Sequence, residues 1–232
     1  PWPRPRTYGA TDSMSIDQTQ AKAEQLLSQA GILPVVTADS VDEARKLSAA
    51  LLKGGLTAIE LTLRTPCALD ALVALKKELP GIAVGMGTVT TVEQMQKCIE
   101  LGADFLVTPG TPAELADALA RAPIPAVPGG ATPTEFLSLM ARGFRVCKLF
   151  PANAVGGLAM LKGLAGPLAE LKICPTGGIT EDTAAEFLAQ PNVVCVGGSW
   201  MVPKNWLKAG EWDKVEASAA KAAGIVAAAR AA

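Results

Sequence analysis

A lysine, a glutamate and an arginine stand where the sequence predicts buried strands. Lys148 lies in the middle of the apolar run "FRVCKLFPA", while Glu60 and Arg64 lie in "AIELTLR". A lysine in a buried strand loses its hydration, so it needs a partner, a shifted pKa or a chemical task. Its unprotonated amine can attack a carbonyl carbon and form a Schiff base. Lys148 could equally extend past the strand end into solvent or pair with a carboxylate.

Glu60 and Arg64 share one side of their predicted strand, because alternate strand residues face the same way. Glu60 could transfer protons while a carbinolamine forms and breaks, or it could be only an ion-pair partner of Lys148 or Arg64. A guanidinium suits bidentate binding of a substrate carboxylate, although Arg64 could merely neutralise Glu60. Thr88 ends another predicted strand, where it could bind the same carboxylate or cap a helix.

Two glycine pairs mark the ends of the last two predicted strands. "PTGGIT" contains Gly177 and Gly178, and "VGGSW" contains Gly197 and Gly198. Bare backbone N–H groups, the hydroxyl of Ser199 and a short helix expected at about 200–207 would form a phosphate cradle. One such pair could simply permit a tight turn. Two pairs on neighbouring strands favour phosphate binding.

The composition excludes several kinds of chemistry. The 232 residues contain no histidine, which excludes Ser-His and Cys-His nucleophile pairs and histidine-ligated zinc. The five cysteines include no C-x-x-C pair, a pattern typical of reduced thiols in a cytoplasmic protein. A net charge of -1 gives no footprint for nucleic acid, and no apolar run approaches the roughly 18 residues of a membrane-spanning helix. We therefore expect no nucleic acid or membrane partner. We also expect no metal and no cofactor, because an iminium formed on Lys148 would itself act as the electron sink.

Strand-like and helical segments alternate along the chain from about residue 33. Eight runs have strand character: 33–37, 58–63, 83–88, 105–110, 124–129, 145–150, 172–178 and 193–199. Eight successive β-α units predict an α/β protein of the (β/α)8 TIM barrel type, with the polar strand ends gathered at one mouth. An open doubly wound sheet is the alternative, but no G-x-G-x-x-G follows the first strand.

The helical segments carry start signals. Ser40, Thr111-Pro112 and Thr132-Pro133 precede predicted helices. Residues 15–31 predict an amphipathic helix before the first strand, placed to close the bottom of the barrel. Residues 1–14 begin with "PWPRP" and lack an apolar signal region, so we expect a disordered extension there and a single domain over 15–232.

Six motifs in this order carry a family resemblance: "IELTLRT", "GMGTV", "TPGTP", "KLFPA", "CPTGGI" and "VGGSW". From about residue 20 to 215, the chain resembles the 2-keto-3-deoxy-6-phosphogluconate (KDPG) aldolases, also called 2-keto-4-hydroxyglutarate (KHG) aldolases. The resemblance implies a cytoplasmic, homotrimeric class I lyase of the Entner–Doudoroff pathway. Such a lyase reversibly cleaves KDPG to pyruvate and D-glyceraldehyde 3-phosphate, with some activity on KHG.

The resemblance also implies a role for each matching residue. Lys148 would be the Schiff-base lysine and Glu60 the acid–base, while Arg64 and Thr88 would bind the pyruvyl carboxylate. The remaining substrate contacts implied are a pyruvate pocket lined by Pro109 and Phe150, a hydrogen bond from Thr176, and a phosphate held by Gly177, Gly178, Gly198 and Ser199.

Two residues depart from the family pattern. Met86 stands between two glycines where a smaller residue is usual, and it is expected to face inward and narrow the lumen. Cys147 replaces a bulkier residue and is expected to point outward, where it affects packing only. Two other functions stay open: a barrel isomerase or synthase that binds a sugar phosphate without a covalent step, and a non-catalytic phosphate-sensing barrel.

Overall fold

The computed structural model describes residues 14–231, so all of the predicted N-terminal extension except Met14 lies outside the described residues. The strands are β1 Ile32–Val36, β2 Ala58–Thr62, β3 Ala83–Gly87, β4 Phe105–Val107, β5 Ala126–Val127, β6 Gly129–Gly130, β7 Val146–Leu149, β8 Lys172–Pro175 and β9 Val196–Gly198. The helices are α1 Ile16–Ala30, α2 Val41–Lys53, α3 Ala68–Glu78, α4 Val92–Glu100, α5 Ala113–Leu119, α6 Pro133–Met140, the 3-10 helix η1 Asn153–Val155, α7 Gly157–Ala165, α8 Glu181–Leu188, α9 Lys204–Ala209 and α10 Trp212–Ala231. The predicted alternation of strands and helices is confirmed.

The strands form a curled parallel arrangement in two hydrogen-bonded sheets. One sheet has the order β5-β4-β3-β2-β1-β9 and the other has the order β6-β7-β8. The predicted strand 124–129 is split at Pro128 into β5 and β6, which pair with different neighbours. Proline has no N–H to donate to a ladder, so the chain changes partner there. Between β8 and β9 the contact consists of two isolated bridges, Ile173 with Val193 and Thr176 with Gly197.

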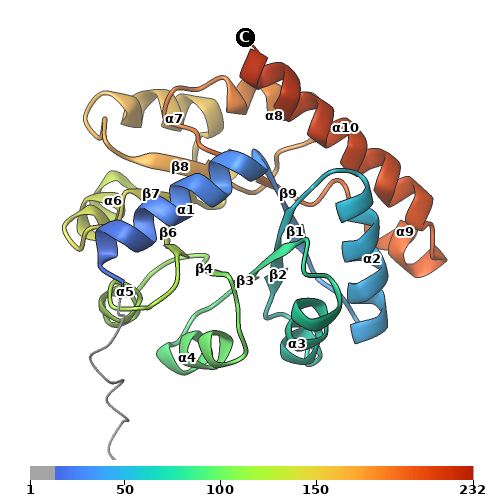
Figure 1. The fold of residues 1–232 in the computed structure, drawn as a ribbon. Coiled ribbons are helices and arrows are strands. Elements are labelled where there is room, and N and C mark those ends of the chain that lie inside the picture. Colours follow the sequence, from blue (N-terminus) through green and yellow to red (C-terminus); the bar gives the residue numbers. More distant parts are fainter. Residues whose placement is uncertain (1–13, 232) are drawn as a thin grey trace, which may run out of the picture.

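The helices surround the strands, and α1 crosses over the centre of this arrangement (Figure 1). Alternate strand residues face opposite sides, so the core divides into two clusters. The outer cluster lies between strands and helices and includes Cys147, whose predicted outward orientation is confirmed. The inner cluster joins α1 to inward-facing residues around the strands: Ala23, Leu27, Ala30, Leu33, Ala58, Phe105, Val107, Val127, Val146, Cys174 and Cys195.

Gln20 anchors α1 to the strands. It is buried, and its Nε2 donates a hydrogen bond of 2.9 Å to the carbonyl oxygen of Ala126. Its Oε1 accepts from the backbone N–H groups of Arg145 at 3.0 Å and Val146 at 2.9 Å. One polar side chain therefore satisfies three backbone groups next to β5 and β7, and it holds α1 against this end of the strands.

The three predicted helix starts are confirmed, and two of them have the expected side-chain cap. The hydroxyls of Ser40 and Thr132 cap α2 and α6, each accepting from a backbone N–H three residues later. The helix α5 also begins at the predicted place, at Ala113 directly after Thr111-Pro112, but its N-cap residue is Pro112 and no side chain caps it. The hydroxyl of Thr111 instead donates to the carbonyl of Gly129 and pairs with Thr108. A tertiary contact between two strand ends thus replaces the cap.

The prediction that Met86 narrows the lumen is wrong. Met86 lies in the outer cluster, and the glycines on either side of it face inward. A Cβ atom on Gly85 would collide with the ring of Phe105, and one on Gly87 would collide with the carboxylate of Glu60. The inward positions 85 and 87 therefore have no room for a side chain, and strand alternation places Met86 on the outside.

Candidate active site

Lys148 and Glu60 form a buried ion pair between β7 and β2. The Nζ atom of Lys148 lies 2.9 Å from Oε1 and 3.1 Å from Oε2 of Glu60. The two side chains are only 4% and 1% exposed. Each charge thereby has a hydrogen-bonded partner in a site with little water, which a buried charge requires.

This pair has the geometry for proton transfer to and from an amine. A lysine must lose a proton before its nitrogen can attack a carbonyl, and a carboxylate at 2.9 Å is placed to take it. The ring of Phe150 lies 5.3 Å from Nζ and supplies an apolar wall. Pro109 follows β4 and lies against Gly129, which pairs in register with Lys148.

Arg64 and Thr88 meet beyond the ends of β2 and β3. Nε of Arg64 donates a hydrogen bond of 3.1 Å to Oγ1 of Thr88. Thr88 has a φ of 59°, the only positive φ of a non-glycine residue within residues 14–231. Such a conformation costs about 1–3 kcal/mol and often marks a functional site. It also departs from the regular alternation of β3, so Thr88 reaches Arg64 although Met86 faces outward. Binding of one substrate carboxylate by Arg64 and Thr88 stays a prediction.

The glycine pairs lie at adjacent strand ends, as the sequence predicts. Gly177 and Gly178 have φ values of 108° and 79°, a region that favours glycine. Thr176 is buried and forms a bridge with Gly197 on the neighbouring strand. Ser199 is exposed directly after β9. The helix expected at about 200–207 is present as α9, which begins later, at Lys204.

Asn153 is a residue that sequence reasoning missed. Its Nδ2 donates a 2.6 Å hydrogen bond to the carbonyl of Gly178, and its backbone N–H donates to Gly177 at 3.1 Å. The N–H of Ala152 donates to Thr176 at 2.8 Å. The loop after β7 is therefore hydrogen-bonded to the turn at Gly177 and Gly178. In the sequence, only the position of Asn153 directly after "KLFPA" could have indicated its role.

Two buried thiols lie near Lys148. Cys174 pairs in register with Lys148, and Cys195 precedes β9. A hydrogen bond from Cys195 and the charge of Lys148 hold the pKa of Cys174 below its ordinary value, against the effect of burial. Burial raises the pKa of Cys195. All five cysteines are free, as predicted.

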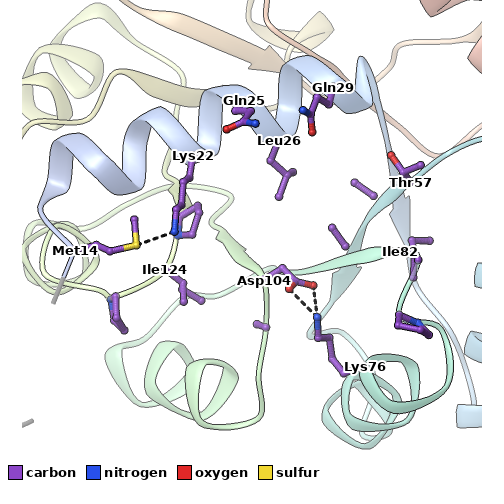
Figure 2. Close-up of a pocket in the computed structure, with 17 residues that line it drawn as sticks. Met14, Lys22, Gln25, Leu26, Gln29, Thr57, Lys76, Ile82, Asp104 and Ile124 are labelled. Carbon is purple, nitrogen blue, oxygen red and sulfur yellow. Dashed lines mark hydrogen bonds and ion pairs between the residues drawn. The ribbon is translucent and has the colours of Figure 1, made fainter. Parts of the chain in front are cut away.

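A cavity lies beneath α1, at the ends of the strands opposite to the predicted site residues (Figure 2). It has a volume of about 690 Å³ and contains none of the predicted site residues. Its ion pair joins Lys76 to Asp104 at 2.7 Å, and Asp104 also accepts from the N–H of Val84. These contacts satisfy the Asp104 carboxylate within the fold.

Other binding chemistries find little support in the described part of the chain. Within residues 14–231, no group of three or more Cys, Asp or Glu side chains is placed to hold a metal ion. Over the same range, no helix has both the length and the apolar character needed to cross a bilayer.

The fold and the site define a class of protein: a parallel α/β protein with a buried lysine–carboxylate pair on its strands and glycine turns at the strand ends. The chain belongs to the KDPG and KHG aldolase family, whose model matches residues 23–218.

Named relatives and solved structures agree with this membership. The 2-dehydro-3-deoxy-phosphogluconate aldolase of Pseudomonas aeruginosa is 41% identical over 202 residues, which is 87% of this chain and 92% of the relative. The Dickeya dadantii protein of the same name is 39% identical over 203 residues, or 88% and 95% of the two chains. The KDPG aldolase of Legionella pneumophila, solved with pyruvate captured as a covalent carbinolamine, has a TM-score of 0.83 at 37% identity and covers 85% and 96%. The Zymomonas mobilis enzyme, solved with 3-phosphoglycerate, has a TM-score of 0.82 at 36% identity and covers 88% and 95%.

Proposed function

We propose that this protein is a class I aldolase that reversibly cleaves KDPG to pyruvate and D-glyceraldehyde 3-phosphate. The observation that carries the proposal is the buried contact of 2.9 Å between Lys148 and Glu60. The covalent pyruvate of the Legionella enzyme and the names of the relatives support the same chemistry.

Lys148 and Glu60 divide the chemical steps. The amine of Lys148 attacks the C2 carbonyl, and loss of water from the carbinolamine yields an iminium. Glu60 then takes the proton of the C4 hydroxyl, the C3–C4 bond breaks, and its electron pair moves into the iminium to form an enamine. Glyceraldehyde 3-phosphate leaves. Protonation at C3 and hydrolysis release pyruvate and restore the free lysine.

The remaining site residues bind the two ends of the substrate. Arg64 and Thr88 hold the carboxylate, and Pro109 and Phe150 line the pocket around the pyruvyl part. Thr176 donates to the substrate, and the phosphate contacts are Gly177, Gly178, Gly198 and Ser199. The 3-phosphoglycerate in the Zymomonas enzyme supports a site for phosphorylated acids. KHG, which lacks the phosphate, is expected to react more slowly.

The iminium acts as the electron sink, so the reaction needs neither a metal nor a cofactor. We expect a metal chelator to leave the rate of KDPG cleavage unchanged, as measured by release of pyruvate. Strong inhibition by the chelator would contradict this and indicate a metal-dependent aldolase.

The finer architecture and the assembly belong to the same proposal. The two sheets would constitute one (β/α)8 barrel over residues 15–232, with α1 closing its bottom. The inner cluster shared by α1 and the strands supports this. A homotrimer is expected in sedimentation analysis, and the five free cysteines fit a cytoplasmic location.

Borohydride trapping tests the proposed function directly. Incubation with pyruvate and reduction should add one reduced pyruvate to Lys148, located by peptide mass spectrometry. Lys148→Met should form no adduct. An unmodified Lys148 in the wild-type protein would contradict the Schiff base and favour an isomerase or synthase that binds sugar phosphates without a covalent step.

A further inference from the structure

A cavity of about 240 Å³ opens at the strand ends, between Arg64 and the start of α9. Its wall includes Thr37, which follows β1, together with Ser199 and Lys204. Arg64 and Ser199 already have proposed roles at the two ends of the substrate. Thr37 and Lys204 have none, so the cavity extends the proposed site by two polar residues.

The charges around this cavity suit an anion. Its lining contains Arg64 and Lys204 but no carboxylate. Within residues 14–231, neither cation lies within ion-pair distance of an aspartate or glutamate. Two cations beside one cavity repel each other, and a substrate with an anionic group at each end would place a negative charge near each of them.

The location of Lys204 is not explained by the stability of its own helix. Lys204 is the first residue of α9, where the helix dipole disfavours a positive charge. Residues that break a local rule are expected at functional sites. Its position on the cavity wall with Ser199 supplies a function for the charge.

Thr37 offers the cavity a hydrogen-bond acceptor. The hydroxyl of Thr62 donates to the carbonyl of Val36 at 3.0 Å. The 2.8 Å contact between the hydroxyls of Thr37 and Thr62 must therefore use the proton of Thr37. The lone pairs of Thr37 are left to accept from a bound molecule. A cavity with two cations and such an acceptor fits a hydroxylated chain that ends in an anion.

We infer that Lys204 is a specificity-determining residue that contacts the phosphate of the substrate, beside Ser199, and that Thr37 accepts a hydrogen bond from a substrate hydroxyl. This inference rests on the proposed aldolase function. It adds a charged contact to a phosphate site that otherwise consists of backbone N–H groups and one hydroxyl.

The test compares kcat/KM for KDPG with kcat/KM for its unphosphorylated analogue, 2-keto-3-deoxygluconate. Lys204→Met should lower the value for KDPG about three- to tenfold and leave the value for the analogue unchanged. Lys208→Met is the matched control, because Lys208 is exposed on the same helix but does not line the cavity. It should change neither value. Lys204→Arg should retain most of the preference for phosphate.

Three outcomes would overturn the role of Lys204: an unchanged preference in Lys204→Met, an equal loss on both substrates, or the same loss in Lys208→Met. Thr37→Val should lower kcat/KM severalfold on both substrates, because both carry the hydroxyls. Unchanged kinetics in Thr37→Val would overturn the role of Thr37.

Pyruvate trapping separates this inference from the proposed function. Pyruvate carries no phosphate, so wild type and Lys204→Met should form the Lys148 adduct at the same rate. Adduct formation together with an unchanged substrate preference in Lys204→Met would overturn only the inference about Lys204. A wild-type protein without an adduct would overturn both.

Discussion

At the scale of single residues, the contact between Glu60 and Lys148 explains why a lysine is buried in a strand. Each side chain supplies the charge that the other needs, and each would otherwise be costly to bury. The absence of histidine leaves Glu60 as the acid–base group that touches the proposed nucleophile. The catalytic hypothesis therefore rests on two side chains that can be changed separately.

Glu60→Gln should lower kcat for KDPG cleavage by about 10²- to 10⁴-fold, because an amide keeps the shape of the carboxylate but cannot accept the proton. Pyruvate trapping at Lys148 should become slower without being abolished. The matched control is Glu186→Gln, at an exposed position of α8, which should leave both rates unchanged. Full activity in Glu60→Gln would contradict the proposed role of Glu60.

The thiols provide a second prediction at this scale. Burial raises the pKa of Cys98 to about 11 and raises the pKa of Cys147 further, so both stay protonated at neutral and mildly alkaline pH. Cys174 and Cys195 are shielded from solvent, whereas Cys67 is half-buried. Iodoacetamide near pH 8 should therefore modify Cys67 first in the native protein, as read by peptide mass spectrometry. Unfolded protein, the control, should react at all five cysteines, and rapid native labelling of Cys98 would contradict the prediction.

At the scale of elements, β3 shapes the site by leaving space rather than by supplying a side chain. Gly85 and Gly87 face inward. The space that a side chain would occupy at Gly85 is taken by Phe105, and at Gly87 it is taken by Glu60. The "GMG" pattern therefore creates room for the Glu60 carboxylate, and Met86 packs on the other side.

Gly87→Ala tests this account. The new methyl group would displace the Glu60 carboxylate, and we expect kcat to fall about 10²-fold, because small misplacements of catalytic groups have effects of that size. Overpacking should also lower the free energy of unfolding by about 1–3 kcal/mol.

Gly163→Ala is the matched control, since a Cβ atom at this position on α7 would meet nothing within 4 Å. It should keep full activity and raise the free energy of unfolding by about 0.4–1 kcal/mol. Equal effects of the two substitutions on activity would contradict the proposed role of Gly87.

At the scale of the whole molecule, α1 connects parts of the chain that are distant in sequence. Gln20 bonds to Ala126 and to the start of β7, more than a hundred residues away. The helix α1 also packs against β1, β5 and β7, and its apolar residues belong to the inner cluster. Residues 15–231 should therefore unfold in a single cooperative transition.

Gln20→Leu removes three hydrogen bonds and leaves buried backbone groups without partners. We expect the free energy of unfolding in urea to fall by about 3 kcal/mol. Gln25→Leu is the matched control, because Gln25 lies at an exposed position of α1 beside the cavity of Figure 2. It should shift the free energy of unfolding by no more than about 0.5 kcal/mol. Similar losses in both variants would show that α1 is not held through Gln20.

The sequence alone determined the order of the elements and the chemical groups at the strand ends. Alternation along a strand is a local property, and it was sufficient to turn Cys147 outward, although the same reasoning gave the wrong orientation for Met86. Glycine pairs likewise indicated turns, because few other residues tolerate a positive φ.

Only the tertiary structure decided which groups meet. Glu60 and Lys148 are 88 positions apart in sequence, and their 2.9 Å contact depends on how far the strands curl. The inward orientation of Gly85 and Gly87 depends on Phe105 and Glu60, which occupy the space from other strands. The left-handed conformation of Thr88, which bonds to Arg64 from another strand end, was likewise not evident from the sequence. Local patterns indicate which orientations and contacts are open to each residue. Packing between distant segments decides which of these occur, because backbone pairing and excluded volume act across the whole fold.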